Sequence, residues 1–130
     1  MKTIVVALAL FGSSAFASNA YDLKMDLSLN KKHVASPRLI VKSGEMNAIN
    51  QKNANEDEHF IEVIATEGSI QNKKGILMNF TIGTIGKNGE KTILAKPQII
   101  AKENEPAQIT IGEKNGAEVS LSVTATRKSL

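Results

Sequence analysis

The chain has 130 residues, no cysteine and no tryptophan, and a formal net charge of +3 at pH 7. The absence of cysteine excludes disulfides, thiolate metal sites, cysteine nucleophiles and a lipid anchor attached through cysteine. Lysines and acidic residues are interspersed and the only tyrosine is Tyr21, whereas a nucleic-acid-binding face needs clustered basic residues and stacking aromatic rings. We therefore expect a mixed, solvated surface and no nucleic-acid partner.

The first 17 residues have the three parts of a bacterial signal peptide. Lys2 gives the positive start, residues 4–11 are almost entirely apolar, and Ala15-Phe16-Ala17 has the small-residue spacing that signal peptidase requires. The apolar run is too short to span a membrane, and no later segment reaches the roughly 20 apolar residues that a span needs. We expect cleavage after Ala17, with a second candidate site after Ala20, and an exported protein that is periplasmic or extracellular.

After this leader, apolar and polar residues alternate with the two-residue period of β-strands. Residues 21–30 place apolar side chains on one face and polar side chains on the other. No window has the apolar spacing of an amphipathic helix, so the sequence predicts an all-β domain. The same alternation occurs at 76–83 and 119–126, and shorter runs rich in Ile and Val occur at 38–41, 59–65, 92–95, 98–101 and 108–111.

Turn residues separate these strands. Asn88-Gly89 and Asn115-Gly116 lie between alternating runs, and Asn-Gly tolerates positive φ at both central positions of a type I′ turn. We therefore predict two tight hairpins there. The three prolines, Pro37, Pro97 and Pro106, cannot donate to a ladder and are expected at strand starts, edges or turns.

The most informative feature is an internal repeat with a period of 60 residues. Residues 37–66 align without a gap on residues 97–126 with ten identities, where about two are expected by chance. Gly44 corresponds to Asn104, and these are the residue types that most readily adopt a left-handed backbone, so we expect the same tight turn in each half. The identical pairs are Pro37/Pro97, Ile40/Ile100, Lys42/Lys102, Glu45/Glu105, Ile49/Ile109, Asn55/Asn115, Glu58/Glu118, Val63/Val123, Ala65/Ala125 and Thr66/Thr126.

Each repeat is expected to contain a long strand, a strand that begins at the proline, a short strand and a closing strand. Four strands with one apolar face cannot bury that face alone, so the two repeats should pack on each other. The sequence thus predicts a pseudo-symmetric β-sandwich of about eight strands, produced by the internal duplication. Residues 18–130 would form this single domain, with repeats at about 21–68 and 75–127. An intertwined arrangement, in which the repeats exchange strands between sheets, is an open alternative.

The segment PQIIAKENEPAQITIGE, which begins at Pro97, resembles the strand-turn-strand motif in the core domain of bacterial secretins. In that motif a proline-led strand is followed by a turn and an A-x-I-x-x-G strand, to which Ala107, Ile109 and Gly112 correspond. The first repeat departs from the motif, with Asn47 at the alanine position and Lys52 at the glycine position. The resemblance implies a related stand-alone β-module of the cell envelope, and the chain has no room for a secretin pore.

The inventory of reactive groups is small, and we predict no catalytic, cofactor-binding or metal-binding residues. No serine lies in a G-x-S-x-G or S-x-x-K motif. His33 is expected in a solvated turn, whereas His59 aligns with Val119 on the core-facing side of a strand, where it is either a structural histidine or a ligand or catalytic group. Residues 53–57 resemble the start of a calcium loop, but Glu58 and Ile64 stand where that loop needs glycine and glutamate.

One asymmetry between the repeats suggests a docking site. Phe60 and Ile64 lie on the strand face where the second repeat has Ser120 and Thr124. Either a neighbouring strand or loop covers the two apolar side chains, or they form a hydrophobic patch that docks another protein or a second copy of this one.

Three functions are compatible with these features. The leading hypothesis is a non-enzymatic exported protein-interaction module of a bacterial envelope or secretion pathway. The alternative is a structural subunit that donates residues 21–30, directly behind the leader, to a neighbour in a surface assembly. A hydrolase or metal-dependent enzyme is the third hypothesis, which the scarcity of reactive groups disfavours.

Overall fold

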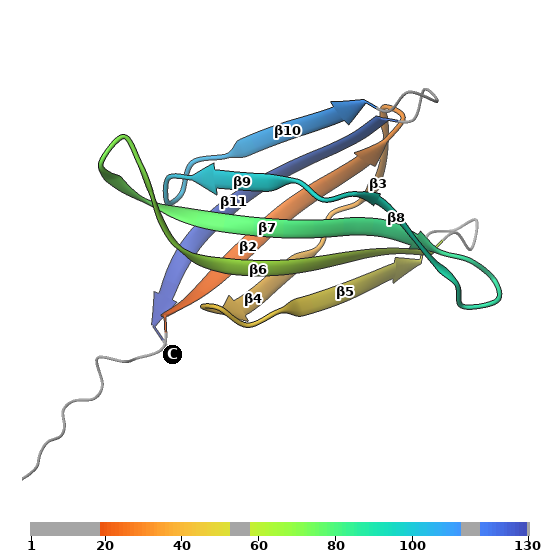
Figure 1. Ribbon diagram of the computed structural model, residues 1–130, viewed down its shortest axis with the longest axis horizontal. Helices are drawn as coiled ribbons and strands as arrows, with labels where there is room; N and C mark the ends of the chain where they lie inside the picture. The colour runs from red at the N-terminus through yellow and green to blue at the C-terminus, as the bar shows by residue number, and fades with distance from the viewer. Residues whose placement is uncertain (1–18, 53–57, 113–117, 130) are drawn as a thin grey trace, which may run out of the picture.

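The computed structural model describes residues 19–52, 58–112 and 118–129, which form ten β-strands and no helix (Figure 1). The predicted all-β class is therefore confirmed. None of the described residues belongs to a helix of the length and apolarity that a membrane crossing requires. The predicted signal peptide lies outside the described residues. The strands are β2 (Asn19–Leu29), β3 (Lys32–Ala35), β4 (Arg38–Lys42), β5 (Asn47–Lys52), β6 (Glu58–Ile70), β7 (Lys73–Ile85), β8 (Lys91–Ala95), β9 (Gln98–Ala101), β10 (Ala107–Gly112) and β11 (Glu118–Ser129).

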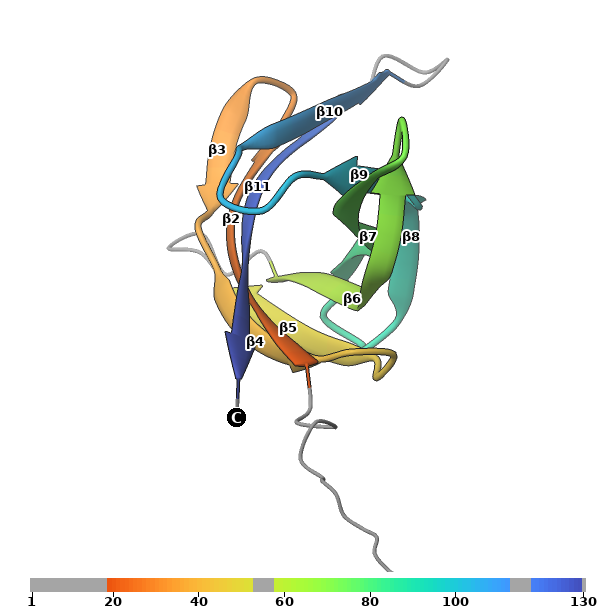
Figure 2. The ribbon, with the colours of Figure 1, turned by 90° about the vertical axis from the view of Figure 1, so that its left-hand side faces the viewer.

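The strands form two antiparallel sheets that pack face to face, as the predicted β-sandwich requires. In the first sheet β10, β11 and β2 lie side by side, and both β3 and β4 pair with the remaining edge of β2. In the second sheet β5, β6 and β7 lie side by side, and both β8 and β9 pair with the remaining edge of β7. Figure 2 shows β2, β3 and β11 on one side of the molecule and β7, β8 and β9 on the other.

The two repeats have the same strand topology and are intertwined. Tyr21 of β2 pairs with Val41 of β4, and the corresponding residues of the second repeat, Ile76 and Ala101, pair in the same way. Each repeat gives its first three strands to one sheet and its last two to the other. The ladders β11–β2 and β6–β7 therefore join strands of different repeats. Of the two arrangements left open by the sequence, the structure has the one with exchanged strands.

The sandwich has two strands more than expected, because each repeat contains a short strand before its proline. These strands, β3 and β8, pair beyond a bulge that interrupts both ladders at equivalent places, between Leu27 and Ser28 and between Ile82 and Gly83. The registers also show where the repeats differ in length. β7 follows β2 by 55 residues, whereas all later strands follow their counterparts by 60, so residues 86–90 are an insertion in the second repeat.

The prediction of a type I′ turn at Asn88-Gly89 is wrong, because the loop is longer than two residues. Gly89 has a φ of 83°, but Asn88 is not in the left-handed region. The loop is closed by a hydrogen bond from Gly89 N to Gly86 O, and the Asn88 side chain accepts one from Glu90 N. Two-residue turns with positive φ at both positions occur instead at 30–31 and 71–72. The other predicted turn, Asn115-Gly116, lies outside the described residues.

The equivalent corners predicted at Gly44 and Asn104 are confirmed. Both residues have positive φ, 80° and 65°. Gly44 N donates to Ala65 O, and Asn104 N donates to Ala125 O, over distances of 2.9 and 2.8 Å. Each corner follows the third strand of its repeat, β4 or β9, in one sheet. It is hydrogen-bonded to the long closing strand of the same repeat, β6 or β11, in the other sheet.

A single apolar core fills the space between the sheets. The alternation in the long strands explains its composition, because every second residue points inward and is almost fully buried. Burial of each large side chain contributes about 1.5–3 kcal/mol, so β2 alone is a major contributor to stability. Its large members are Tyr21, Leu23, Leu27, Val41, Ile61, Val63, Ile76, Met78, Ile82, Leu121 and Val123.

A charged network holds the two closing strands together at one end of the sandwich. Arg127 of β11 bonds both carboxylate oxygens of Glu67 in β6, at 3.0 and 2.8 Å, and also contacts Glu103 at 2.9 Å. The Tyr21 hydroxyl donates to Glu67 at 2.6 Å, and burial raises the pKa of this phenol. The hydrogen bonds from Arg127 lower the pKa of both Glu67 and Glu103. Glu67 and Arg127 are equivalent positions of the two repeats, so this pair lies near the pseudo-twofold axis.

Candidate functional site

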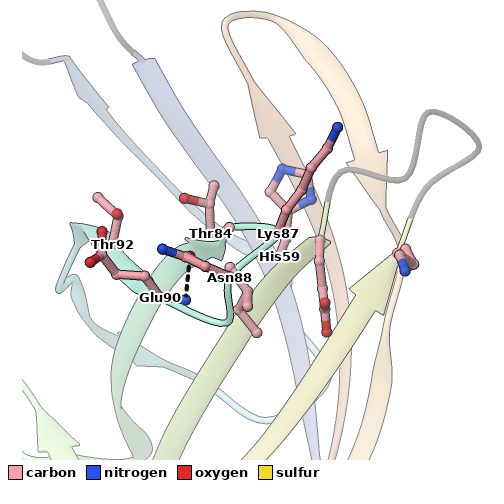
Figure 3. Close-up of a pocket in the computed structure, with 10 residues that line it drawn as sticks. His59, Thr84, Lys87, Asn88, Glu90 and Thr92 are labelled. Atoms are coloured by element: carbon pink, nitrogen blue, oxygen red, sulfur yellow. Dashed lines mark hydrogen bonds between the residues drawn. The ribbon is translucent and has the colours of Figure 1, made fainter.

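An open pocket lies at one end of the second sheet. It has a volume of about 850 Å³ and lies between the ends of β5 and β6 and the β7–β8 hairpin (Figure 3). Its side chains carry both signs of charge, an imidazole, an amide and two hydroxyl groups, which suits hydrogen bonding to a polar ligand. The lining residues are Lys52, Glu58, His59, Thr84, Ile85, Gly86, Lys87, Asn88, Glu90 and Thr92.

His59 is the one histidine in this pocket, and the structure places it on the core-facing side of β6, as its alignment with Val119 predicted. The residue is 6% exposed, in line with Ile61 and Val63 of the same strand. A buried histidine is a polar group at a position where the other repeat has an aliphatic one. Such a substitution costs stability unless the ring finds hydrogen-bonding partners.

Residues of the insertion in the second repeat line this pocket. At the equivalent end of the first sheet, the short turn at 30–31 brings Asn30 onto the start of β11, where Asn30 N donates to Glu118 O and the Asn30 side chain accepts from Glu118 N, both at 2.8 Å. In the second repeat Ile85 stands at the position of Asn30 and pairs with Glu58 in the β6–β7 ladder, so the strands meet in the same way but without a capping amide side chain, and the β7–β8 hairpin is extended by residues 86–90. Among the described residues the two ends therefore differ in the length of this hairpin and in the side chain at its start, Asn30 in one repeat and Ile85 in the other.

Comparisons of this chain with protein-family models, with curated proteins and with solved structures find no match.

The carboxylates and the imidazole of the pocket do not form a metal site. Within residues 19–52, 58–112 and 118–129 no three side chains of His, Asp or Glu gather closely enough to hold a metal ion. The candidate calcium segment, residues 53–57, lies outside the described residues. The chemistry that the described pocket offers is hydrogen bonding and charge pairing.

A second cluster contains the residue types of a hydrolytic triad, but not the connections. Ser36 Oγ donates to Asp26 Oδ1 and contacts His33 Nε2, both at 2.6 Å, and that same ring nitrogen lies 3.6 Å from Asp26. A nucleophilic serine gives its proton to one ring nitrogen while the carboxylate holds the other nitrogen. Here Ser36 and Asp26 both approach the same nitrogen of His33, whereas a triad uses both ring nitrogens. All three residues are exposed, so the arrangement is a surface hydrogen-bond cluster. His33 was expected in a turn, and it lies instead in the short strand β3.

The two residues singled out as a docking patch lie in different environments. Phe60 is 2% exposed, because its ring lies on Gly83 of the neighbouring strand and under the Lys91 ammonium, 4.9 Å from the ring centroid. Ile64 is half-buried on the same outer face. For Phe60 the structure therefore gives the first of the two alternatives, coverage by neighbouring strands.

Substitution of His59 distinguishes its two possible roles. We expect His59→Val to raise the unfolding temperature by about 4–8 °C, because an aliphatic side chain here extends the buried apolar row of Ile61 and Val63 and gains about 1 kcal/mol. Thermal unfolding followed by circular dichroism measures the shift. The matched control is Val119→His, which should lower the unfolding temperature.

A His59→Val protein that unfolds earlier than the wild type would contradict this expectation. The ring would then contribute to stability, and His59 would be the structural histidine. A gain in stability would instead mean that the sequence keeps the imidazole in the pocket at a thermodynamic cost.

Proposed function

We propose that this protein is an exported, non-enzymatic interaction module of a bacterial envelope or secretion pathway, and that it binds another protein through the outer face of the second sheet. The candidate leader at residues 1–17 and the resemblance of the β9–β10 segment to the secretin core motif support an envelope location. The outer face of the second sheet supports the mode of binding.

The observation that carries this proposal is the difference between the outer faces of the two sheets. Three apolar side chains cluster on the second sheet, and we call them the apolar face: Ile64, Leu77 and Ile100. Ile100 is directly opposite Leu77 in the β7–β9 ladder. Ile64 is opposite Asn79 in the β6–β7 ladder, and Asn79 is the next residue after Leu77 on the same face of β7. Ile100 is exposed, whereas Ile64 and Leu77 are half-buried.

The pseudo-symmetry supplies an internal comparison for this face. At the three equivalent positions the first sheet has Thr124, Asp22 and Ile40. Asp22 is covered by Arg38, whose guanidinium donates to both carboxylate oxygens at 2.9 and 2.5 Å and lowers the pKa of that carboxyl. On the first sheet an ion pair thus stands at the centre of these three positions, whereas the second sheet has three adjacent apolar side chains, of which Ile100 is exposed. Such a cluster is typical of a protein-binding surface.

Paired substitutions on the two sheets test this proposal. We expect Leu77→Thr combined with Ile100→Thr to reduce capture of the protein partner at least tenfold, since each truncation at a binding hot spot costs more than about 1 kcal/mol. The capture is measured by cross-linking in the native host and mass spectrometry of the adducts. The matched control is Ile40→Thr, which removes an isoleucine at the equivalent position of the first sheet that is even more exposed, 52% against 40% for Ile100.

Unchanged thermal unfolding of the variants would show that the fold is intact. Equal loss of adducts in the Ile40→Thr control, or no loss in the double variant, would count against the apolar face as the docking surface.

A further inference from the structure

The sandwich contains two equivalent junctions between its repeats, and only one of them is linked by a turn. In the first, β6 pairs with β7 from Glu58 to Ile70, and residues 71–72 join the two strands. In the second, β11 pairs with β2 over the whole of β2, up to the pair Ser129 and Asn19. These strands come from opposite ends of the described chain, so no turn joins them. The second junction shows that this ladder forms without a connecting turn.

Neither half of the chain completes a sheet by itself, and each half supplies the strands that the other half lacks. Within residues 19–70 the ladders join β2 to β3 and β4, and β5 to β6, but these two groups lie in different sheets. The pairing that completes each sheet comes from residues 73–129. The first half of one molecule could therefore be completed by the second half of any other copy of the same chain.

The linking turn at 71–72 has the features of a hinge. Gln71 and Asn72 have φ values of 50° and 65°, in the left-handed region that L-residues adopt at a cost. Asparagine tolerates this region better than other residues with side chains, but glutamine lacks that advantage. If the turn opens into an extended segment, this strain is released, and short strained loops favour exchange of elements between molecules.

We propose that two copies of this protein exchange halves by opening the turn at residues 71–72. The product is a closed dimer with two sandwiches, each built from residues 19–70 of one copy and 73–129 of the other. Its ladders and core contacts are those of the monomer, apart from the hinge. The partner is thus a second copy of this chain, and the exchange does not depend on the apolar face.

Substitutions that reduce the backbone strain at residues 71–72 should reduce the exchange of halves. The wild-type protein and the double variant Gln71→Asn, Asn72→Gly would be refolded from denaturant at the same high micromolar concentration, and the dimer fraction measured by size-exclusion chromatography with light scattering. We expect about fivefold less dimer in the variant, because Asn-Gly fits the type I′ turn with less strain. The matched control is Lys31→Gly, which creates Asn-Gly in the turn between β2 and β3. This turn stays closed in both the monomer and the exchanged dimer, so the substitution should leave the dimer fraction unchanged.

A cross-link identifies the exchange itself, and the cysteine-free chain makes it specific. Glu62 and Thr81 are directly opposite each other in the β6–β7 ladder. We would refold a mixture of the single variants Glu62→Cys and Thr81→Cys under oxidising conditions. In an exchanged dimer, residue 62 of one copy faces residue 81 of the other, so a disulfide-linked heterodimer should form.

Two results would overturn the proposal. One is a wild-type protein that refolds only to the monomer at high concentration. The other is a dimer in which the two cysteine variants do not become linked, because such a dimer would be formed by docking of intact sandwiches.

Discussion

A chain that lacks residues 19–29 should not fold on its own. These residues form β2, which lies in the middle of the first sheet with β11 along one edge and β3 and β4 along the other. Its inward side chains Tyr21, Leu23, Met25 and Leu27 are at most 2% exposed. Loss of their burial would remove about 8 kcal/mol, which is comparable to the whole stability of a domain of this size. Far-ultraviolet circular dichroism and the dispersion of amide NMR signals would report the unfolding.

A synthetic peptide of residues 19–29, added in trans, should restore the fold of the truncated chain. The β11–β2 ladder contains no connecting turn, so the peptide can enter the same place without a covalent link. A control peptide in which the four inward residues are serine should have no effect. Recovery with the matching peptide alone would show that burial, and not backbone pairing by itself, drives the binding.

This experiment also separates two functional hypotheses. A structural subunit that donates residues 21–30 to a neighbour would keep its own fold without them. A truncated protein that stays folded and monomeric would therefore contradict our expectation and favour strand donation. Unfolding of the truncated chain would show that β2 completes its own sandwich.

The sequence was sufficient to predict the layers of the fold but not the partner of each strand. Two-residue alternation identifies the inward side chains, and Tyr21 and Leu23 are buried as that pattern requires. The repeat correctly paired Gly44 with Asn104 at equivalent corners. Alternation carries no information on which strand lies alongside, because the ladder is formed by backbone groups that all residues share. The exchange of strands between sheets could therefore only be left open.

The short strand β3 was missed for a local reason. β3 has the sequence KHVA, and a mixed run of four residues is too short to show a period. β8 coincides with the run predicted at 92–95, which the expected four-strand repeat left out. Both strands are held by their ladder with a long neighbour, a tertiary contact that the local sequence does not reveal.

The pocket was not predicted, although the sequence contained a signal for it. His59 stood out because it aligns with Val119, but an open space needs the hairpin that faces it. That hairpin is extended by residues 86–90, which appear in the sequence as unequal spacing between the long strand and the proline in the two repeats. An insertion in one copy of a symmetric fold is where the two copies can differ in function.

The environment of Phe60 depends on a glycine in the neighbouring strand, and replacement of that glycine should be strongly destabilising. A Cβ on Gly83 would lie 2.2 Å from the backbone oxygen of Thr92 and 2.6 Å from the Phe60 ring. We expect Gly83→Ala to lower the free energy of unfolding by about 3 kcal/mol or more, because a backbone group cannot move aside as a flexible side chain can. Urea denaturation measures the change, and Gly112→Ala, whose Cβ meets nothing within 4 Å, is the matched control.

The cost of Gly83→Ala should be smaller in a Phe60→Ala background than in the wild type, although Phe60→Ala is itself destabilising because the ring is buried. Removal of the ring relieves the contact with Phe60 but leaves the one with Thr92, so the two substitutions should couple by about 1 kcal/mol or more. Phe60 belongs to the covered part of the outer face only if its ring lies on Gly83. If Gly83→Ala is as mild as the Gly112→Ala control, the ring must lie elsewhere, and Phe60 would return to the surface that is available for docking beside Ile64.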